Sequence, residues 1–210
     1  SVLVRAFKEA DEARVIEPTE EDRARWGGYD VAFVGSGGYH PEWPHRPELV
    51  DRLRVRYGSR FVHIGGGADA DAHGPDGGAL RGEALNRCYA TIPVFVGDYC
   101  FADRAVRYWS DRFAETWGRG GFLVFPAKAK LWEDVHAVIA SPIETEIPHS
   151  ATFYNGDLLP SWRIGDWEGL FSTIEQALAE PLARDAWRAR MQPWIAAEHT
   201  YVNRVRTMLD

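Results

Sequence analysis

Residues 108–126 carry the sequence YWSDRFAETWGRGGFLVFP, which predicts one helix, one glycine turn and one buried strand in succession. We expect the helix over 110–117 and the strand over 122–125, because a helix-period run gives way to glycines and then to consecutive apolar residues. Three polar side chains on this joint are suited to hold a phosphorylated ribose: Ser110, Arg112 and Glu115.

The same alternation of strands and helices runs through the rest of the chain. Short apolar runs end in glycine or polar turns, and helix-period runs follow them. We expect strands at 31–34, 60–64, 93–96 and 151–154, helices at 47–57, 81–90, 167–178 and from Pro181, and a last amphipathic stretch at 200–209. This alternation implies an α/β fold with a Rossmann-like, mainly parallel sheet and helices on both faces.

Residues 1–28 are mixed and charged, and we expect them to form a short extension that precedes the domain. A short strand is predicted at 2–7, followed by an extended connector around Pro18. The Rossmann-like domain is therefore expected over 29–210.

Ligands of parallel α/β sheets bind beyond the carboxyl ends of the strands. The predicted loops at that edge are 35–38, 65–67, 97–99 and 126–128. Glycine in three of them allows backbone N–H groups to approach an anion closely. The candidate binding residues in the first two loops are Gly35, Ser36, Gly37, Gly38, Gly65 and Gly66.

Composition indicates a soluble globular protein. Apolar residues make up 45% of the 210 residues, and no apolar run approaches the roughly 20 residues of a membrane helix. We therefore expect no membrane insertion. The formal charge of −7 argues against a broad nucleic-acid-binding surface, though not against a local basic groove. Two cysteines form no disulfide framework and the amino terminus lacks a secretory-signal pattern, so a cytoplasmic location is expected.

Several common chemistries lack their sequence signature. The GSGGYH turn after the first strand departs from the G-x-G-x-x-G spacing of dinucleotide-binding folds, and the second strand ends at Gly65 without an acidic residue for a ribose. The sequence contains no P-loop and no G-x-S-x-G nucleophile elbow. Its seven histidines are scattered without metal-ligand spacing, so no metal site is predicted.

Five segments occur in one order along the chain. They are YDVAFVGS at 29–36, the helix start around His45 and Arg46, LRGEALNRCYATIPVFVGD at 80–98, YWSDRFAETWGRGGFLVFP at 108–126, and EHTYVNRVRTML at 198–209. In combination they resemble the donor-binding, carboxyl-terminal lobe of GT-B glycosyltransferases. More narrowly, they are similar to the bacterial and phage group with spore-maturation-type and "glycosyl transferases group 1" regions.

The resemblance implies a nucleoside-diphosphate sugar as donor substrate, with no further cofactor and no metal ion. Glu115 would accept hydrogen bonds from both ribose hydroxyls, since a carboxylate is an acceptor-only group. Gly120 and Gly121 would let the chain turn tightly under the nucleotide. Arg112 and Arg46 are the candidate catalytic residues, because a cation offsets the charge that develops on the leaving diphosphate.

The implied function is transfer of a sugar, with retention, to an acceptor such as a phage DNA base or a protein. Arg107 stands where many retaining members carry a second carboxylate. Only a short segment precedes the first strand, where GT-B enzymes have an acceptor lobe, so the resemblance implies that residues 1–28 are either an extension or the remnant of that lobe. An alternative is a non-catalytic nucleotide-sugar-binding module or subunit, completed by a partner lobe or by a homo-oligomer. A third hypothesis is a Rossmann-like, nucleotide-processing hydrolase with a catalytic carboxylate at Asp98.

Overall fold

The computed structural model describes residues 13–37, 45–66, 70–74, 78–98, 111–127 and 160–200, together with Asn203 and Arg206. In these parts of the chain the strands are β1 (Val31–Val34), β2 (Phe61–Ile64), β3 (Val94–Val96), β4 (Leu123–Pro126) and β5 (Ser161–Trp162). The helices are α2 (Glu20–Trp26), α3 (Arg46–Tyr57), α4 (Gly82–Thr91), α5 (Asp111–Gly118), α7 (Trp167–Ala179) and α8 (Pro181–Glu198), with a 3-10 turn, η2, at Gly58–Arg60.

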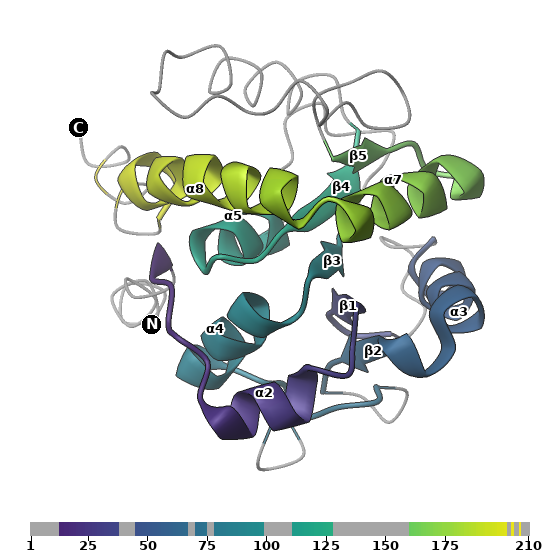
Figure 1. Cartoon of the computed structure of the whole chain (residues 1–210), viewed down its shortest axis with the longest axis horizontal. Helices are drawn as coiled ribbons and strands as arrows, with labels where there is room; N and C mark the ends of the chain where they lie inside the picture. Colours follow the sequence, from purple (N-terminus) through teal and green to yellow (C-terminus); the bar gives the residue numbers. More distant parts are fainter. Residues whose placement is uncertain are drawn as a thin grey trace.

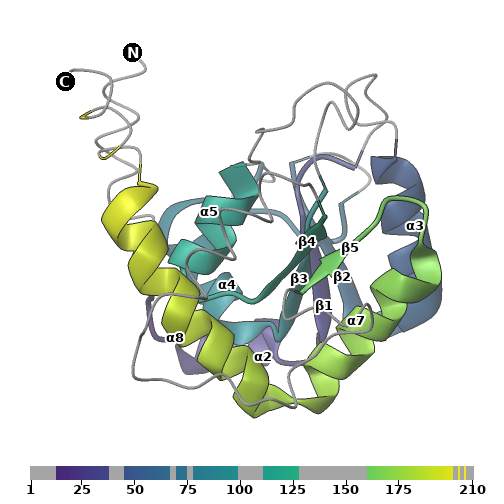
Figure 2. The same ribbon diagram turned by 90° about the horizontal axis from the view of Figure 1, so that it is seen from above.

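The strands form one parallel sheet in the order β2-β1-β3-β4-β5 (Figure 1). Val31 is in register with Phe61 on one side and with Val94 on the other, so β1 lies between β2 and β3. Helices α3 and α7 cover one face, whereas α4 and α5 cover the other (Figure 2). The expected Rossmann-like α/β fold is confirmed.

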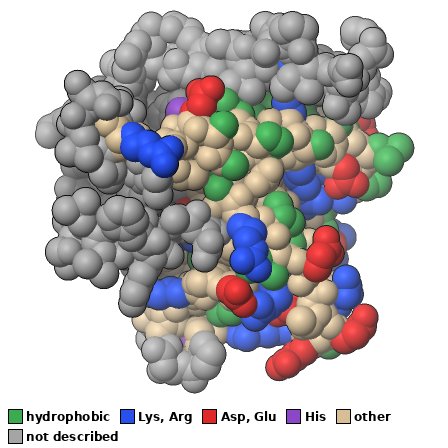
Figure 3. Space-filling model, turned by 90° about the vertical axis from the view of Figure 1, so that its left-hand side faces the viewer, with side chains coloured by type: hydrophobic (Ala, Val, Ile, Leu, Met, Phe, Trp, Pro, Cys, Tyr) green, Lys and Arg blue, Asp and Glu red, His purple; other side chains and the backbone are tan. Residues whose placement is uncertain are grey.

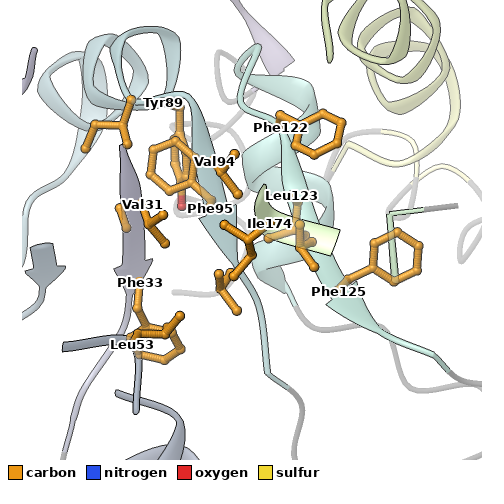
Figure 4. Close-up of a cluster of buried hydrophobic side chains, with 14 of the residues drawn as sticks. Val31, Phe33, Leu53, Tyr89, Val94, Phe95, Phe122, Leu123, Phe125 and Ile174 are labelled. Carbon is orange, nitrogen blue, oxygen red and sulfur yellow. The ribbon is translucent and has the colours of Figure 1, made fainter. Parts of the chain in front are cut away.

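Continuous apolar runs in β1, β3 and β4 follow from burial of the sheet on both faces, which is usual for parallel sheets. Val31, Val94 and Val124 have no exposed surface. Aromatic rings fill the space between sheet and helices, and those of Tyr89 on α4 and Phe95 on β3 lie 4.7 Å apart between centroids (Figure 4).

Two elements differ from expectation. Helix α2 takes the place of an extended connector after Pro18, because Thr19 and Asp22 cap each other's backbone N–H groups in a capping box. Strand β5 is only two residues long, too short to give a periodic signal in the sequence. The strands expected at 2–7 and 151–154 lie outside the described residues, as does most of the stretch 200–209.

The described part of the predicted extension packs on the sheet domain. Trp26 is buried in the common core, and Asp22 pairs with Arg87 of α4 at 3.0 Å. Nearer the amino terminus, the carbonyl of Ala13 accepts a hydrogen bond from Gln192 of α8 at 2.7 Å. Trp26 therefore belongs to the same hydrophobic core as the sheet, and Ala13 and Asp22 are bonded to α8 and α4.

Candidate functional site

The strand order places a topological switch point between β1 and β3. From β1 the chain continues to β2 on one side, and it later returns to β3 on the other side. Ligands of open α/β sheets bind in the crevice at the carboxyl ends of such a strand pair. A binding site is therefore expected at the loops that leave β1, β2 and β3 at this edge.

The two glycine loops after β1 and β2 touch one another. The backbone N–H of Gly35 donates to the carbonyl of Ile64 at 2.9 Å, and a Cβ atom at position 65 would collide with the Gly35 carbonyl oxygen. The His63 ring, fully buried on β2, lies with its Nε2 atom 2.8 Å from the same oxygen. Because a carbonyl only accepts, His63 Nε2 carries the proton. Gly35 and Gly65 thus lie together at the carboxyl edge, as expected.

A buried arginine–aspartate pair joins the ends of β1 and β3. Arg46, the first residue of α3, donates from Nε to Oδ2 of Asp98 at 2.6 Å and from Nη2 to Oδ1 at 3.2 Å. Its Nη1 atom donates to Oγ of Ser36 at 3.0 Å and to the Ser36 carbonyl at 3.3 Å. Arg46 and Asp98 are only 9% and 7% exposed, whereas Ser36 is exposed.

This pairing argues against the catalytic role that the sequence predicts for Arg46. Asp98 balances the charge of its guanidinium, and Nε, Nη1 and Nη2 are all engaged with groups of the protein. Asp98 itself was expected to matter only for the nucleotide-processing hydrolase. The sequence does indicate a polar residue, Asp98, just after the strand β3. Its partner Arg46 could not be predicted, because their contact depends on the order of the strands in the sheet.

Arg112 and Glu115 form a second pair on α5. This helix connects β3 to β4, so its first turn starts from the carboxyl-edge side of the sheet. Arg112 donates from Nη1 to a carboxylate oxygen of Glu115, with side chains 37% and 17% exposed respectively. Of the two candidate catalytic arginines, Arg112 is therefore the more accessible.

The buried phenol of Tyr89 interacts electrostatically with this pair. Burial raises the pKa of Tyr89, so the phenol stays protonated at neutral pH. Burial would lower the pKa of Arg112, but Tyr89 and Glu115 outweigh it and raise that pKa above its usual range. Tyr89 is only 1% exposed, so of these three side chains only Arg112 and Glu115 have surface that could meet a polar ligand.

Gly120 and Gly121 lie at the opposite edge of the sheet from Gly35 and Gly65, and their role under a nucleotide stays a prediction. They precede β4, whereas the loops of Gly35 and Gly65 follow their strands. Added Cβ atoms would lie 3.0 Å from Val15 at position 120 and 3.1 Å from Tyr89 at position 121. These glycines therefore allow close packing of the chain on itself.

Helix α8 also runs along this amino edge. Arg188 donates to the carbonyl of Pro93, just before β3, at 3.1 Å, and the rings of Trp187 and Trp117 lie 6.2 Å apart. Helix α8 thus packs at the amino edge, whereas the Arg46–Asp98 pair lies at the carboxyl edge.

Four predicted binding residues remain: Gly37, Gly38, Gly66 and Ser110. Gly66 follows Gly65, and a Cβ there would lie 3.1 Å from the backbone nitrogen of Ala79. Gly37 continues the loop after Ser36. Gly38 and Ser110 lie outside the described residues.

Comparison with known proteins gives no relative for this chain: no family model, no curated protein and no solved structure matches it. Within the described residues, no helix is long and apolar enough to cross a membrane. In the same parts of the chain, no three His, Cys, Asp or Glu side chains gather in a way that could hold a metal ion. On the face shown in Figure 3, the described Lys and Arg side chains are interspersed with Asp and Glu.

Proposed function

We propose that this protein binds a nucleoside-diphosphate sugar at the carboxyl edge of its sheet and transfers the sugar to an acceptor, as a glycosyltransferase. One observation carries the proposal. At the switch point between β1 and β3, contacting glycine loops meet Ser36, an exposed residue whose hydroxyl accepts a hydrogen bond from the buried Arg46–Asp98 pair. The N–H groups of Gly35 and Gly65 are themselves bonded to the carbonyls of Ile64 and Ala72, so the Ser36 hydroxyl is the group that suits a diphosphate oxygen at this switch point.

The Arg112–Glu115 pair supports the nucleoside half of the donor. Glu115 is partly exposed and accepts hydrogen bonds only, which matches the two donor hydroxyls of a ribose. Arg112 would stabilise the negative charge on the leaving diphosphate in the transition state. In the reaction, the bond from the anomeric carbon to the diphosphate oxygen breaks, and a bond to an acceptor oxygen forms with release of its proton.

The test is calorimetric titration of the full chain with uridine, guanosine, adenosine, cytidine and thymidine diphosphates. We expect one of them to bind, and Glu115→Gln to weaken that binding by on the order of tenfold to a hundredfold, because a hydrogen bond to a charged group is lost. The matched control is Glu20→Gln, which removes an exposed carboxylate that also pairs with an arginine one helical turn away, and it should leave affinity unchanged.

Two results would contradict the proposal: no binding of any diphosphate, or undiminished binding by Glu115→Gln. If the chain binds a diphosphate but neither transfers nor hydrolyses any donor sugar, a non-catalytic nucleotide-sugar-binding module becomes the better description.

A further inference from the structure

Arg46 bridges two strand ends and has little surface of its own. Its guanidinium donates hydrogen bonds to Asp98, after β3, and to Ser36, after β1. Only 10% of its side chain is exposed, so the guanidinium lies behind Ser36, which is itself exposed. A ligand at this edge would meet the serine first.

The balanced charge of the Arg46–Asp98 pair also indicates that Ser36, rather than Arg46, meets the ligand. Asp98 accepts from two nitrogens of Arg46, and this fork geometry fixes the plane of the guanidinium while its charge is balanced. A neutral, rigid pair attracts a distant anion weakly, but it holds a neighbouring group accurately. Arg46 is therefore better placed to orient Ser36 than to neutralise the charge of a ligand directly.

The hydrogen-bond direction at Ser36 is also informative. A serine hydroxyl has one proton and two lone pairs. Because Nη1 of Arg46 donates to Oγ, the single hydroxyl proton is directed to another group. Nη1 also donates to the Ser36 carbonyl, which holds the backbone of the loop. An acceptor-rich group such as a phosphate complements a hydroxyl oriented in this way.

The geometry points to Arg46 and Asp98 as positioning residues that orient the Ser36 hydroxyl as a phosphate-binding group. This inference rests on the proposed function, because the phosphate is that of the proposed donor. It assigns Asp98 a role in diphosphate recognition and makes Ser36, rather than Arg46, the residue that contacts the ligand.

The test is a double-mutant cycle on binding of the diphosphate that the wild type prefers, with the corresponding nucleoside as a second ligand. One arm is Ser36→Ala. The other is Arg46→Met combined with Asp98→Leu, because apolar replacement of both partners of a buried ion pair leaves no unpaired charge and is often tolerated. Each arm should weaken diphosphate binding by about tenfold and leave nucleoside binding unchanged.

The variant that combines Ser36→Ala with Arg46→Met and Asp98→Leu shows whether the pair acts through Ser36. If the pair acts through Ser36, adding Ser36→Ala to the apolar pair should cause little further loss, since interacting residues are not additive. The matched control is Arg60→Met with Asp30→Leu, a pair of 2.8 Å at the amino edge, which should bind both ligands normally. Thermal unfolding without ligand checks that each variant is folded.

The other outcomes overturn the inference. Additive losses would mean that Arg46 contacts the ligand itself, and unchanged diphosphate affinity would mean that the pair is only structural. Should the apolar pair fail to fold, Arg46→Lys replaces it, because a single ammonium lacks the fork that holds both Asp98 and Ser36. Lack of diphosphate binding by the wild type would overturn the proposed function and this inference with it.

Discussion

Asp22 shows how one carboxylate stabilises the start of a helix. It accepts hydrogen bonds from the backbone N–H of Thr19 at 3.0 Å and from its hydroxyl at 2.7 Å, and it pairs with Arg87 at 3.0 Å. Burial acts to raise the pKa of Asp22, but the bonds from Thr19 and the attraction of Arg87 bring it below the usual value.

The sign of the pH dependence follows from this lowered pKa. A carboxyl group whose pKa is lower in the folded state stabilises the fold above its unfolded pKa of about 3.9. That stabilisation is lost as the pH falls through the folded pKa. We expect Asp22→Asn to lower the free energy of unfolding by about 1 kcal/mol at pH 7, with a difference that shrinks below about pH 4.

Urea unfolding at pH 7, 5 and 3 measures this difference. Glu21→Gln, an exposed change in the same helix turn, is the control and should have little effect at any of the three pH values. A constant difference between wild type and Asp22→Asn across the pH range would contradict the assignment.

At the residue scale, the sequence predicts positions better than partners. Gly35, Ser36 and Gly65 could be placed at the carboxyl edge because glycines interrupt apolar runs there. The pairing of Arg46 with Asp98 could not, because the two residues are far apart in the chain and meet only when β3 lies beside β1.

At the scale of elements, the joint between α5 and β4 is built by contact with a distant segment. Gly120 has a φ of +80°, which disfavours any residue with a side chain, and an added Cβ would lie 3.0 Å and 3.1 Å from the two methyl carbons of Val15. Two separate effects therefore oppose substitution at Gly120.

A matched pair of variants separates these effects. Gly165 has a similar φ of +88°, but an added Cβ there would meet nothing within 4 Å. We expect Gly165→Ala to cost about 1–2 kcal/mol for the backbone conformation alone, and Gly120→Ala to cost about 1 kcal/mol more through crowding. Chemical denaturation measures both costs.

A third variant checks the cause of the difference. Combining Gly120→Ala with Val15→Ala should remove the additional loss of stability, because the crowded methyl groups are gone. Equal costs for Gly120→Ala and Gly165→Ala would show that the segment around Val15 does not press on this joint.

The length of an element decided whether it could be predicted. Helices such as α3 and α7 have 12 and 13 residues and repeat their apolar side chains often enough to be predicted to within two residues at either end. Helix α2 has seven residues and follows a proline, and its capping pair Thr19 and Asp22 was the usable signal. The two residues of β5 carry no period at all.

At the scale of the whole molecule, the two edges of the sheet differ in what the described residues place there. Among the described residues, α8 and the segment at 13–15 pack against the amino edge, whereas the carboxyl edge carries the glycine loops and the Arg46–Asp98 pair. Alternating elements in the sequence predict a parallel sheet. They do not give the strand order, which places the switch point and therefore the proposed site.

The most direct measurement of the central proposal is amide hydrogen exchange of the full chain, with and without the nucleoside diphosphate that binds most tightly. Backbone N–H groups that contact a ligand exchange more slowly. We expect slower exchange in peptides that cover 35–37, 65–66 and 97–98, and no change over 118–121. Protection confined to 118–121, or none at saturating ligand, would contradict a donor site at the carboxyl edge.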